Sequence, residues 1–315
     1  MKRFIKERLL RILVLSLGFV WLYSIPTYAA STFSLAETSS LTLTRKNLAS
    51  SPQILSNLSD LLPHLEKANV VYLGETHDNP QHHQMQLEII QSLHKRQPKI
   101  AIALEMFQRP YQQFLDQYIV GKITEQELLE KTEYNQRWGF PWEHYAPILR
   151  YAQANKLPVL ALNTPSEITR QVAREGLASL TRQQRQFIPP ATEIRTDNAE
   201  YRQLIFGAFE QHQQAGHGSS SDLENFFLAQ VLWDETMAEK IAQFHQAEPS
   251  YQVIVLAGQG HIIYGYGIPS RVVRRLPKNI IQSSVLLSPP EEKVNTNRPI
   301  ANFIIDCPKL QQITP

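Results

Sequence analysis

The chain has 315 residues, with 31 Lys and Arg against 29 Asp and Glu, and 43% of it is hydrophobic. This is the composition of a globular protein with a sizeable core. The single cysteine, Cys307, excludes an internal disulfide or thiolate cluster, so His, carboxylate or Tyr would hold any metal. The sequence has no basic face or aromatic-interleaved Lys and Arg tract, and we expect no nucleic-acid binding.

Residues 1–29 are typical of a secretory signal peptide. Basic residues precede an apolar stretch over residues 12–23, and Ala29 and Ala30 provide small residues at a cleavage point. The apolar stretch is short for a membrane span, so membrane contact is expected only if the signal stays uncleaved. We expect an exported, periplasmic or otherwise extracytoplasmic protein. It is not expected to be a lipoprotein, because no cysteine lies near the cleavage point.

The region after the signal divides into a leader and one domain. Residues 30–59 are rich in Ser and Thr and predict a flexible leader, and residues 60–310 predict a single domain. Its first strand is the apolar run 70–73, which ends at Gly74 and is followed by Glu75 and His77. The helix after Pro80 carries three histidines that we expect to be solvated, His82, His83 and His94.

Three further apolar runs end in polar residues. Residues 100–104 lead to Glu105, residues 158–162 to Asn163, and residues 253–257 to His261. This alternation of strands with helical stretches predicts an α/β fold with a mostly parallel sheet and flanking helices. The polar residues at the carboxyl ends of parallel strands would then converge on one rim of the sheet.

The segment of about 165–247 is helical in pattern and predicts a helical insertion between the third and fourth core strands. Within it, Asp234 lies beside the apolar side of a helix. It could orient a histidine ligand, or pair with an N–H group or an Arg in the core. His217 lies in a Gly- and Ser-rich loop, where an axial haem ligand and a plain surface residue are the alternatives. Residues 285–287 and 303–305 predict the last strands.

The rim carries two Gly-x-x-His motifs, residues 74–77 and 258–261. If a metal binds, we expect His77 and His261 to hold it together with Glu75 or Glu105, since imidazole and carboxylate are the inventory of a divalent-metal site. Glu75 or Glu105 could then act as a general base on bound water. Asn163 suits an oxyanion or supporting role. The alternative is that these groups only cap helices or make turn hydrogen bonds.

Tyr264 and Tyr266 directly follow the second motif. A tyrosine phenolate can bind haem iron, so both are candidate haem-binding residues. Packing against the Gly-rich turn is the alternative.

Together these motifs resemble the ChaN-like haem-binding proteins of the Tiki superfamily. The matching blocks are residues 71–77 (VYLGETH), 103–107 (ALEMF), 232–238 (LWDETMA) and 256–261 (LAGQGH), the last leading to 267–272 (GIPSRV). The resemblance implies an exported α/β protein that binds haem in haem or iron acquisition, with a possible homodimer around the haem. ChaN-like proteins are often lipoproteins, and this chain has no lipobox cysteine.

Two functions follow from the resemblance. In one, haem is the cofactor and ligand, and a Tyr or His binds its iron. In the other, a divalent metal such as zinc, manganese or cobalt at His77, Glu105 and His261 activates water. That second function resembles the metal-dependent proteases and erythromycin-esterase-like hydrolases of the wider superfamily.

Overall fold

The computed structural model describes residues 52–214, 222–288 and 299–307. Its centre is a parallel sheet of seven strands in the order β1-β7-β6-β2-β5-β3-β4. The strands are β1 (Gln53–Leu55), β2 (Val70–Glu75), β3 (Ile100–Gln108), β4 (Val159–Asn163), β5 (Gln252–Gly258), β6 (Gln282–Leu287) and β7 (Phe303–Ile305).

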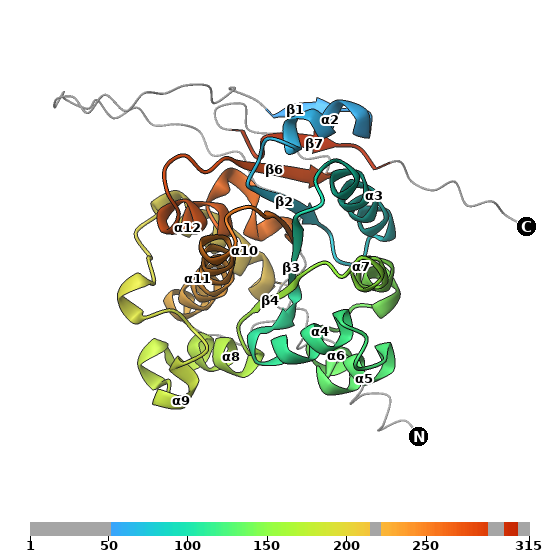
Figure 1. Ribbon diagram of the computed structural model, residues 1–315. Coiled ribbons are helices and arrows are strands. Elements are labelled where there is room, and N and C mark those ends of the chain that lie inside the picture. The colour runs from blue at the N-terminus through green and yellow to red at the C-terminus, as the bar shows by residue number, and fades with distance from the viewer. Residues whose placement is uncertain (1–51, 215–221, 289–298, 308–315) are drawn as a thin grey trace, which may run out of the picture.

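Helices cover both faces of this sheet, with α3 and α7 on one side and α11 and α12 on the other (Figure 1). The helices of the described residues are α2 (Leu58–Leu65), α3 (Pro80–Arg96), α4 (Gln112–Ile119), α5 (Glu125–Lys131), α6 (Tyr134–Arg137), α7 (Trp142–Asn155), α8 (Ser166–Glu175), α9 (Arg182–Arg185), α10 (Ala199–Gln214), α11 (Leu223–Ala247) and α12 (Ile268–Arg275). Short 3₁₀ turns include η1 (Arg109–Tyr111), η4 (Gln259–His261) and η5 (Ile263–Gly265).

The central strands are buried along their whole length, because each is apolar on both faces. In β2, Val71 and Leu73 face the core shared with α3 and α7, whereas Val70 and Tyr72 face the core shared with α11 and α12. Continuous apolar runs of this kind are typical of parallel strands covered by helices on both sides. The predicted α/β fold with a mostly parallel sheet and flanking helices is confirmed.

Helices α8 to α11 occupy the long connection between β4 and β5, which are the third and fourth core strands of the sequence prediction. Asp222 caps α11, since its side chain accepts hydrogen bonds from the backbone N–H groups of Glu224 and Asn225. The helical insertion was therefore predicted in the right place. Helix α11 of this insertion packs against α8, α10 and α12 and contains Asp234.

Part of the leader predicted over residues 30–59 forms regular structure, and the rest of it lies outside the described residues. Gln53–Leu55 forms the edge strand β1, which pairs with β7, and α2 begins at Leu58. A three-residue strand is too short to show a periodic pattern, which is why the sequence did not reveal it. The predicted signal peptide lies outside the described residues. Among the residues that are described, no helix is long and apolar enough to cross a membrane.

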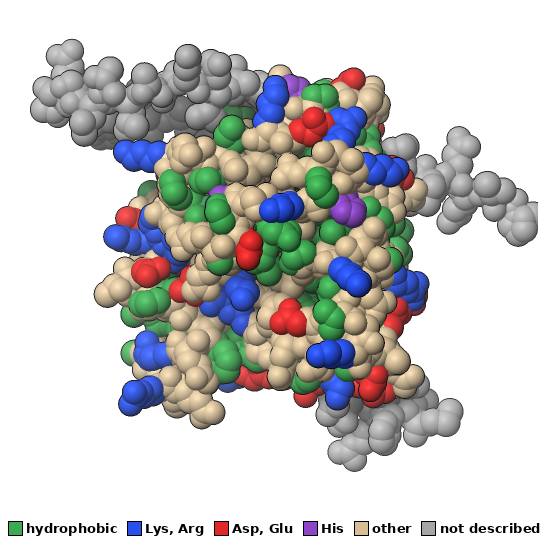
Figure 2. Space-filling model, in the orientation of Figure 1, with side chains coloured by type: hydrophobic (Ala, Val, Ile, Leu, Met, Phe, Trp, Pro, Cys, Tyr) green, Lys and Arg blue, Asp and Glu red, His purple; other side chains and the backbone are tan. Residues whose placement is uncertain are grey.

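On the face drawn in Figure 2, acidic and basic side chains are interspersed rather than gathered into broad areas of one sign. The histidines and carboxylates predicted to form a site lie at the carboxyl ends of β2, β5 and β3. These three strands are direct neighbours, with β5 in the middle. Their last residues therefore meet at one edge of the sheet, which is where open α/β sheets place their ligand sites.

Candidate functional site

Two histidine–carboxylate pairs meet at Glu105. The Nδ1 atom of His77 lies 2.6 Å from Glu75 Oε1, and its Nε2 atom lies 3.9 Å from Glu105 Oε2. On the other side, His261 Nε2 lies 3.4 Å from Glu105 Oε1, and His261 Nδ1 lies 2.8 Å from Asp234 Oδ1. The five side chains form a continuous buried chain in the order Glu75, His77, Glu105, His261, Asp234.

Glu75, the last residue of β2, is fully buried and heavily hydrogen-bonded. Its Oε1 accepts from His77 and from the Tyr145 hydroxyl at 2.5 Å, and its Oε2 accepts from the Gln86 amide at 2.6 Å. Burial alone would raise the pKa of this carboxyl, but His83, His77 and Tyr145 outweigh it and lower the pKa to about 2. Glu75 is therefore a carboxylate that fixes the orientation of the His77 ring.

His82 and His83 are buried, so the prediction that they are solvated was wrong. His83 Nε2 bonds to the backbone oxygen of His77, and its ring stacks on that of His144. His82 Nδ1 accepts from the Thr76 backbone N–H, and burial lowers the pKa of this imidazole to about 4. Both rings point into the protein, where they form hydrogen bonds to the backbone of Thr76 and His77. The third histidine of this helix, His94, is half-buried.

Asp234 reaches the site from α11 and is fully buried. Besides His261, it accepts a hydrogen bond from the Tyr201 hydroxyl at 2.5 Å, and the Arg271 guanidinium lies 3.9 Å away. Burial alone would lower the pKa of His261, but Glu105 and Asp234 outweigh it and raise the pKa to about 10. His261 is therefore an imidazolium held between two carboxylates at neutral pH.

Glu105, in β3, is the shared partner. Its Oε2 accepts the backbone N–H of Gly258 at 2.7 Å, at the point where β5 ends. Burial would raise the pKa of this carboxyl, but His261, His77 and the Gly258 N–H together lower it. The middle of the chain of five residues is therefore anionic.

This pairing predicts a pH-dependent stability. The folded-state pKa of His261 lies above its unfolded value of about 6.5, so its contribution is fully present below pH 6.5 and is lost as the pH rises toward 10. We expect the free energy of unfolding from urea titrations to fall by about 3 kcal/mol between about pH 6.5 and pH 9.5. The His261→Gln variant should lose most of this slope. An equal slope in the variant would contradict the assignment.

Asn163 ends β4 near the same rim. Its amide nitrogen donates to the Glu105 backbone oxygen at 3.0 Å, and its amide oxygen accepts the Thr164 backbone N–H at 2.8 Å. The side chain thus ties β4 to β3 beside the site, where it could support Glu105. Its predicted oxyanion role stays a prediction.

The predicted metal ligands His77, His261 and Glu105 do come together. In residues 52–214, 222–288 and 299–307, however, no group of three or more His, Cys, Asp or Glu side chains is arranged so that it could hold a metal ion. Both Nδ1 atoms are bonded to carboxylates, and both Nε2 atoms face Glu105.

The predicted haem-binding residues lie on the α11 side of the sheet. Tyr266 is buried in an aromatic cluster with Tyr201 and Phe227, and the half-buried Tyr264 packs beside it, with ring centroids 5.5 Å apart. Tyr264 adopts a left-handed backbone conformation with φ of 55°, which is uncommon for a residue with a side chain and is often found at functional positions. His217 lies outside the described residues.

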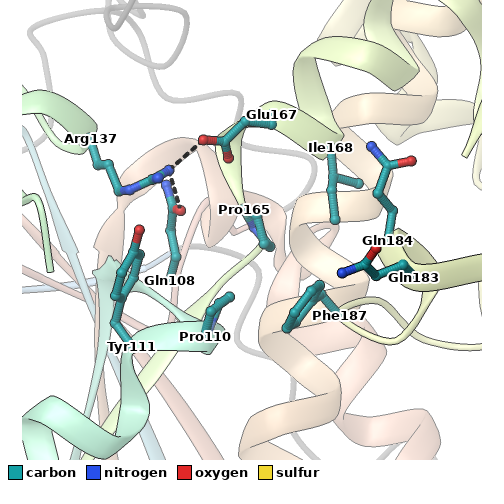
Figure 3. Close-up of a pocket in the computed structure, with 10 residues that line it drawn as sticks. All are labelled: Gln108, Pro110, Tyr111, Arg137, Pro165, Glu167, Ile168, Gln183, Gln184 and Phe187. Carbon is teal, nitrogen blue, oxygen red and sulfur yellow. Dashed lines mark hydrogen bonds and ion pairs between the residues drawn. The ribbon is translucent and has the colours of Figure 1, made fainter. Parts of the chain in front are cut away.

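A cavity of about 300 Å³ lies at the carboxyl end of β3. Figure 3 shows Tyr111 and Arg137 on one side and Phe187 with two glutamine amides on the other. The residues that line it come from the end of β3, from η1, α6, α8 and α9 and from nearby loops: Gln108, Pro110, Tyr111, Arg137, Pro165, Glu167, Ile168, Gln183, Gln184 and Phe187. Its volume is at the lower end of the range for small-molecule sites.

Several site residues were missed by sequence reasoning, namely Gln86, Tyr145 and Tyr201 around the carboxylates and Trp138 and Phe140 against His77. The rings of Trp138 and Phe140 lie 4.6 and 4.9 Å from the His77 ring centroid. The aromatic turn at residues 138–142 was a usable signal, because exposed aromatic turns are rare unless they cover something.

The fold and the site define an α/β protein with a buried histidine–carboxylate chain at the carboxyl edge of a parallel sheet. The chain belongs to the family described as haem-binding uptake, Tiki superfamily, ChaN, whose model matches residues 61–272. This confirms the resemblance inferred from the motifs.

Two similar proteins illustrate the range of the match. The ChaN of Campylobacter jejuni, in a structure described as showing cofacial heme binding, superimposes with a TM-score of 0.61 at 20% identity, covering 78% of this chain and 90% of that one. Protein RETICULATA-RELATED 5, chloroplastic, from Arabidopsis thaliana is 30% identical over 256 residues, which are 76% of this chain. The match spans 34% of that relative's length.

Proposed function

We propose that this protein binds haem and acts in haem or iron acquisition or handling outside the cytoplasm. Membership of a haem-binding family supports the ligand, and the basic and apolar residues of the N-terminal segment 1–29 support export. The observation that carries the proposal is the open cavity at the carboxyl end of β3, which combines apolar and aromatic walls with a phenol and a guanidinium. A planar apolar ligand with an iron centre and acidic substituents suits such a lining.

The side chains at the edge of the sheet differ in how well they fit haem. His77 and His261 are 1% and 6% exposed, and both nitrogens of each ring already face carboxylates. His261 is moreover protonated at neutral pH, and a protonated imidazole has no lone pair for iron. Tyrosines fit better, because Tyr111 lines the cavity and Tyr264 is half-buried. A bound haem would supply the iron centre, and the protein would supply a phenolate and an apolar seat.

In this proposal only one edge of the porphyrin enters the cavity, whose volume is about 300 Å³. A second copy of the chain could cover the remainder, which is the physical basis for proposing a homodimer around haem. The cofacial arrangement in the description of the Campylobacter jejuni protein supports this part of the proposal.

The test is a haemin titration of the purified chain that starts at residue 30, followed by absorbance and by sedimentation. We expect a saturable Soret shift at about one haem per chain, with association into dimers. The His261→Ala variant should bind haem as well as the parent chain does, because His261 is committed to Glu105 and Asp234. The lack of any saturable shift would contradict the proposal.

A second candidate function is hydrolysis at the histidine–carboxylate chain. The observation that favours it is that Glu75 and Asp234 hold the Nδ1 atoms of the two histidines, leaving both Nε2 atoms directed at Glu105. Carboxylates that orient histidines in this way are typical of acid–base and metal sites. If haemin does not bind, and zinc, manganese or cobalt copurifies with the chain but not with His77→Ala, the hydrolase becomes the better candidate.

A further inference from the structure

We propose that residues 137–141 form a lid loop over the histidine–carboxylate chain, and that contacts of the Arg137 guanidinium hold this loop closed. When the lid loop opens, the cavity at the end of β3 and the space around His77 become one larger site. The proposal goes beyond the function proposed above, because it holds whether haem or a hydrolysed substrate occupies that site.

The histidine–carboxylate chain is nearly inaccessible in the closed state. Its five residues are between 0 and 6% exposed. Two rings of the lid loop, Trp138 and Phe140, contact His77 edge-on, and both are half-buried, with part of each ring toward solvent. A ligand therefore reaches His77 when these two rings move away.

The lid loop is anchored at both of its ends. Tyr134 precedes it in α6 and Trp142 follows it at the start of α7, and both side chains are buried, with their ring centroids 5.1 Å apart. Between them Gly139 is exposed and has a φ of 85°, a conformation that glycine adopts readily. A short loop with fixed ends and a central glycine can move without unfolding either helix.

Arg137 ties the lid loop to the rest of the protein. Its Nη1 atom donates to Glu167 of α8 at 2.7 Å and to Gln108 of β3 at 3.1 Å. The Glu167 side chain is exposed, and ion pairs with an exposed partner are weak and are screened by salt. These contacts therefore favour the closed loop by a free energy small enough for it to open at ordinary temperature.

The lid loop also separates two spaces. Arg137 lines the cavity together with Gln108 and Tyr111 (Figure 3), whereas the next residue, Trp138, contacts His77. Neighbouring residues of one segment thus face the cavity on one side and the histidine–carboxylate chain on the other. The cavity alone, of about 300 Å³, is small for an organic ligand, and opening of the loop would enlarge it.

The test measures how fast diethyl pyrocarbonate modifies each histidine, mapped by mass spectrometry on the purified protein without haemin or added metal. When opening and closing are fast, this rate at His77 follows the population of the open loop. We expect Arg137→Gln to raise the rate at His77 by about tenfold, and Glu167→Gln to raise it by about threefold. Glu167 is exposed, so its variant should fold even if the first does not.

The matched control is Arg96→Gln, which removes an exposed ion pair with Glu66 at the end of α3. It should leave the rate at His77 unchanged. A second control lies within each sample, because His261 is covered by Trp233 rather than by the lid loop and should keep its rate in every variant.

Salt provides a readout that general destabilisation would not give. Raising NaCl from about 0.05 M to about 1 M should speed the modification of His77 severalfold in the parent protein and have little effect in Arg137→Gln. Equal rates at His77 in the parent and in both loop variants would overturn the proposal, as would parallel increases at His77 and His261. Since haemin is absent throughout, a failure here leaves haem binding untouched, and a failed haemin titration leaves the lid loop untouched.

Discussion

Replacing Gly267 with Ala is expected to lower the free energy of unfolding by about 3 kcal/mol. A Cβ atom at this position would lie 2.2 Å from the His261 backbone oxygen, 2.8 Å from its carbonyl carbon and 3.0 Å from Asp234 Oδ1. Two of these three atoms are backbone and cannot move aside like a flexible side chain. The added methyl group would therefore push the η4 turn away from α11 and separate His261 from Asp234.

Thermal and urea unfolding would measure this loss, and Gly207→Ala is its matched control. Gly207 lies in α10, where an added Cβ meets no atom within 4 Å. Ala is the better helix former, so this control should gain about 0.5–1 kcal/mol. If both variants had similar stabilities, the tight approach of Gly267 to His261 would not be the reason for a glycine there.

Replacing Asp234 with Asn is expected to cost about 3 kcal/mol and to lower the pKa of His261 from about 10 toward its ordinary value. The substitution keeps the shape of the side chain but removes one of the two charges that stabilise the buried imidazolium. Removing one partner of a buried ion pair is costly because the other charge stays in a poorly solvated place. NMR titration of the His261 ring would measure the pKa directly.

The control for this change is Tyr201→Phe. It removes only the hydroxyl that donates to Asp234, so the expected loss is about 1.5 kcal/mol, and His261 should stay protonated at pH 8. An unaltered His261 pKa in Asp234→Asn would show that Glu105 alone sets the charge of this ring.

Much of the site was predictable because strand ends are readable in the sequence. Apolar runs that stop at Glu75, Glu105 and His261 mark the carboxyl ends of three strands, and parallel pairing then forces their side chains onto one edge. The order of the strands was not predictable. Buried parallel strands all have the same continuous apolar pattern, so nothing local places β5 between β2 and β3.

The surroundings of the site depend on tertiary contacts that no local pattern carries. Gln86 and His83 occupy polar positions of an amphipathic helix and look solvated, yet they turn inward to satisfy Glu75 and the chain near His77. The cavity is formed by segments far apart in sequence, since Tyr111 follows β3, Arg137 ends α6 and Phe187 follows α9. Without the fold, the sequence could not show that Tyr111 contacts Arg137 or that Phe187 lies across the cavity from them.

The central place of β5 has a consequence for how the protein folds. During synthesis, β2 and β3 emerge long before residues 252–258, and each then exposes an apolar edge whose partner has not yet been made. Pairings between residues so far apart in the chain form slowly, so incompletely synthesised chains are prone to aggregation. We therefore expect fragments that stop before β5 to be insoluble. We also expect the protein to depend on chaperones that bind its nascent strands until the last quarter of the chain has been synthesised.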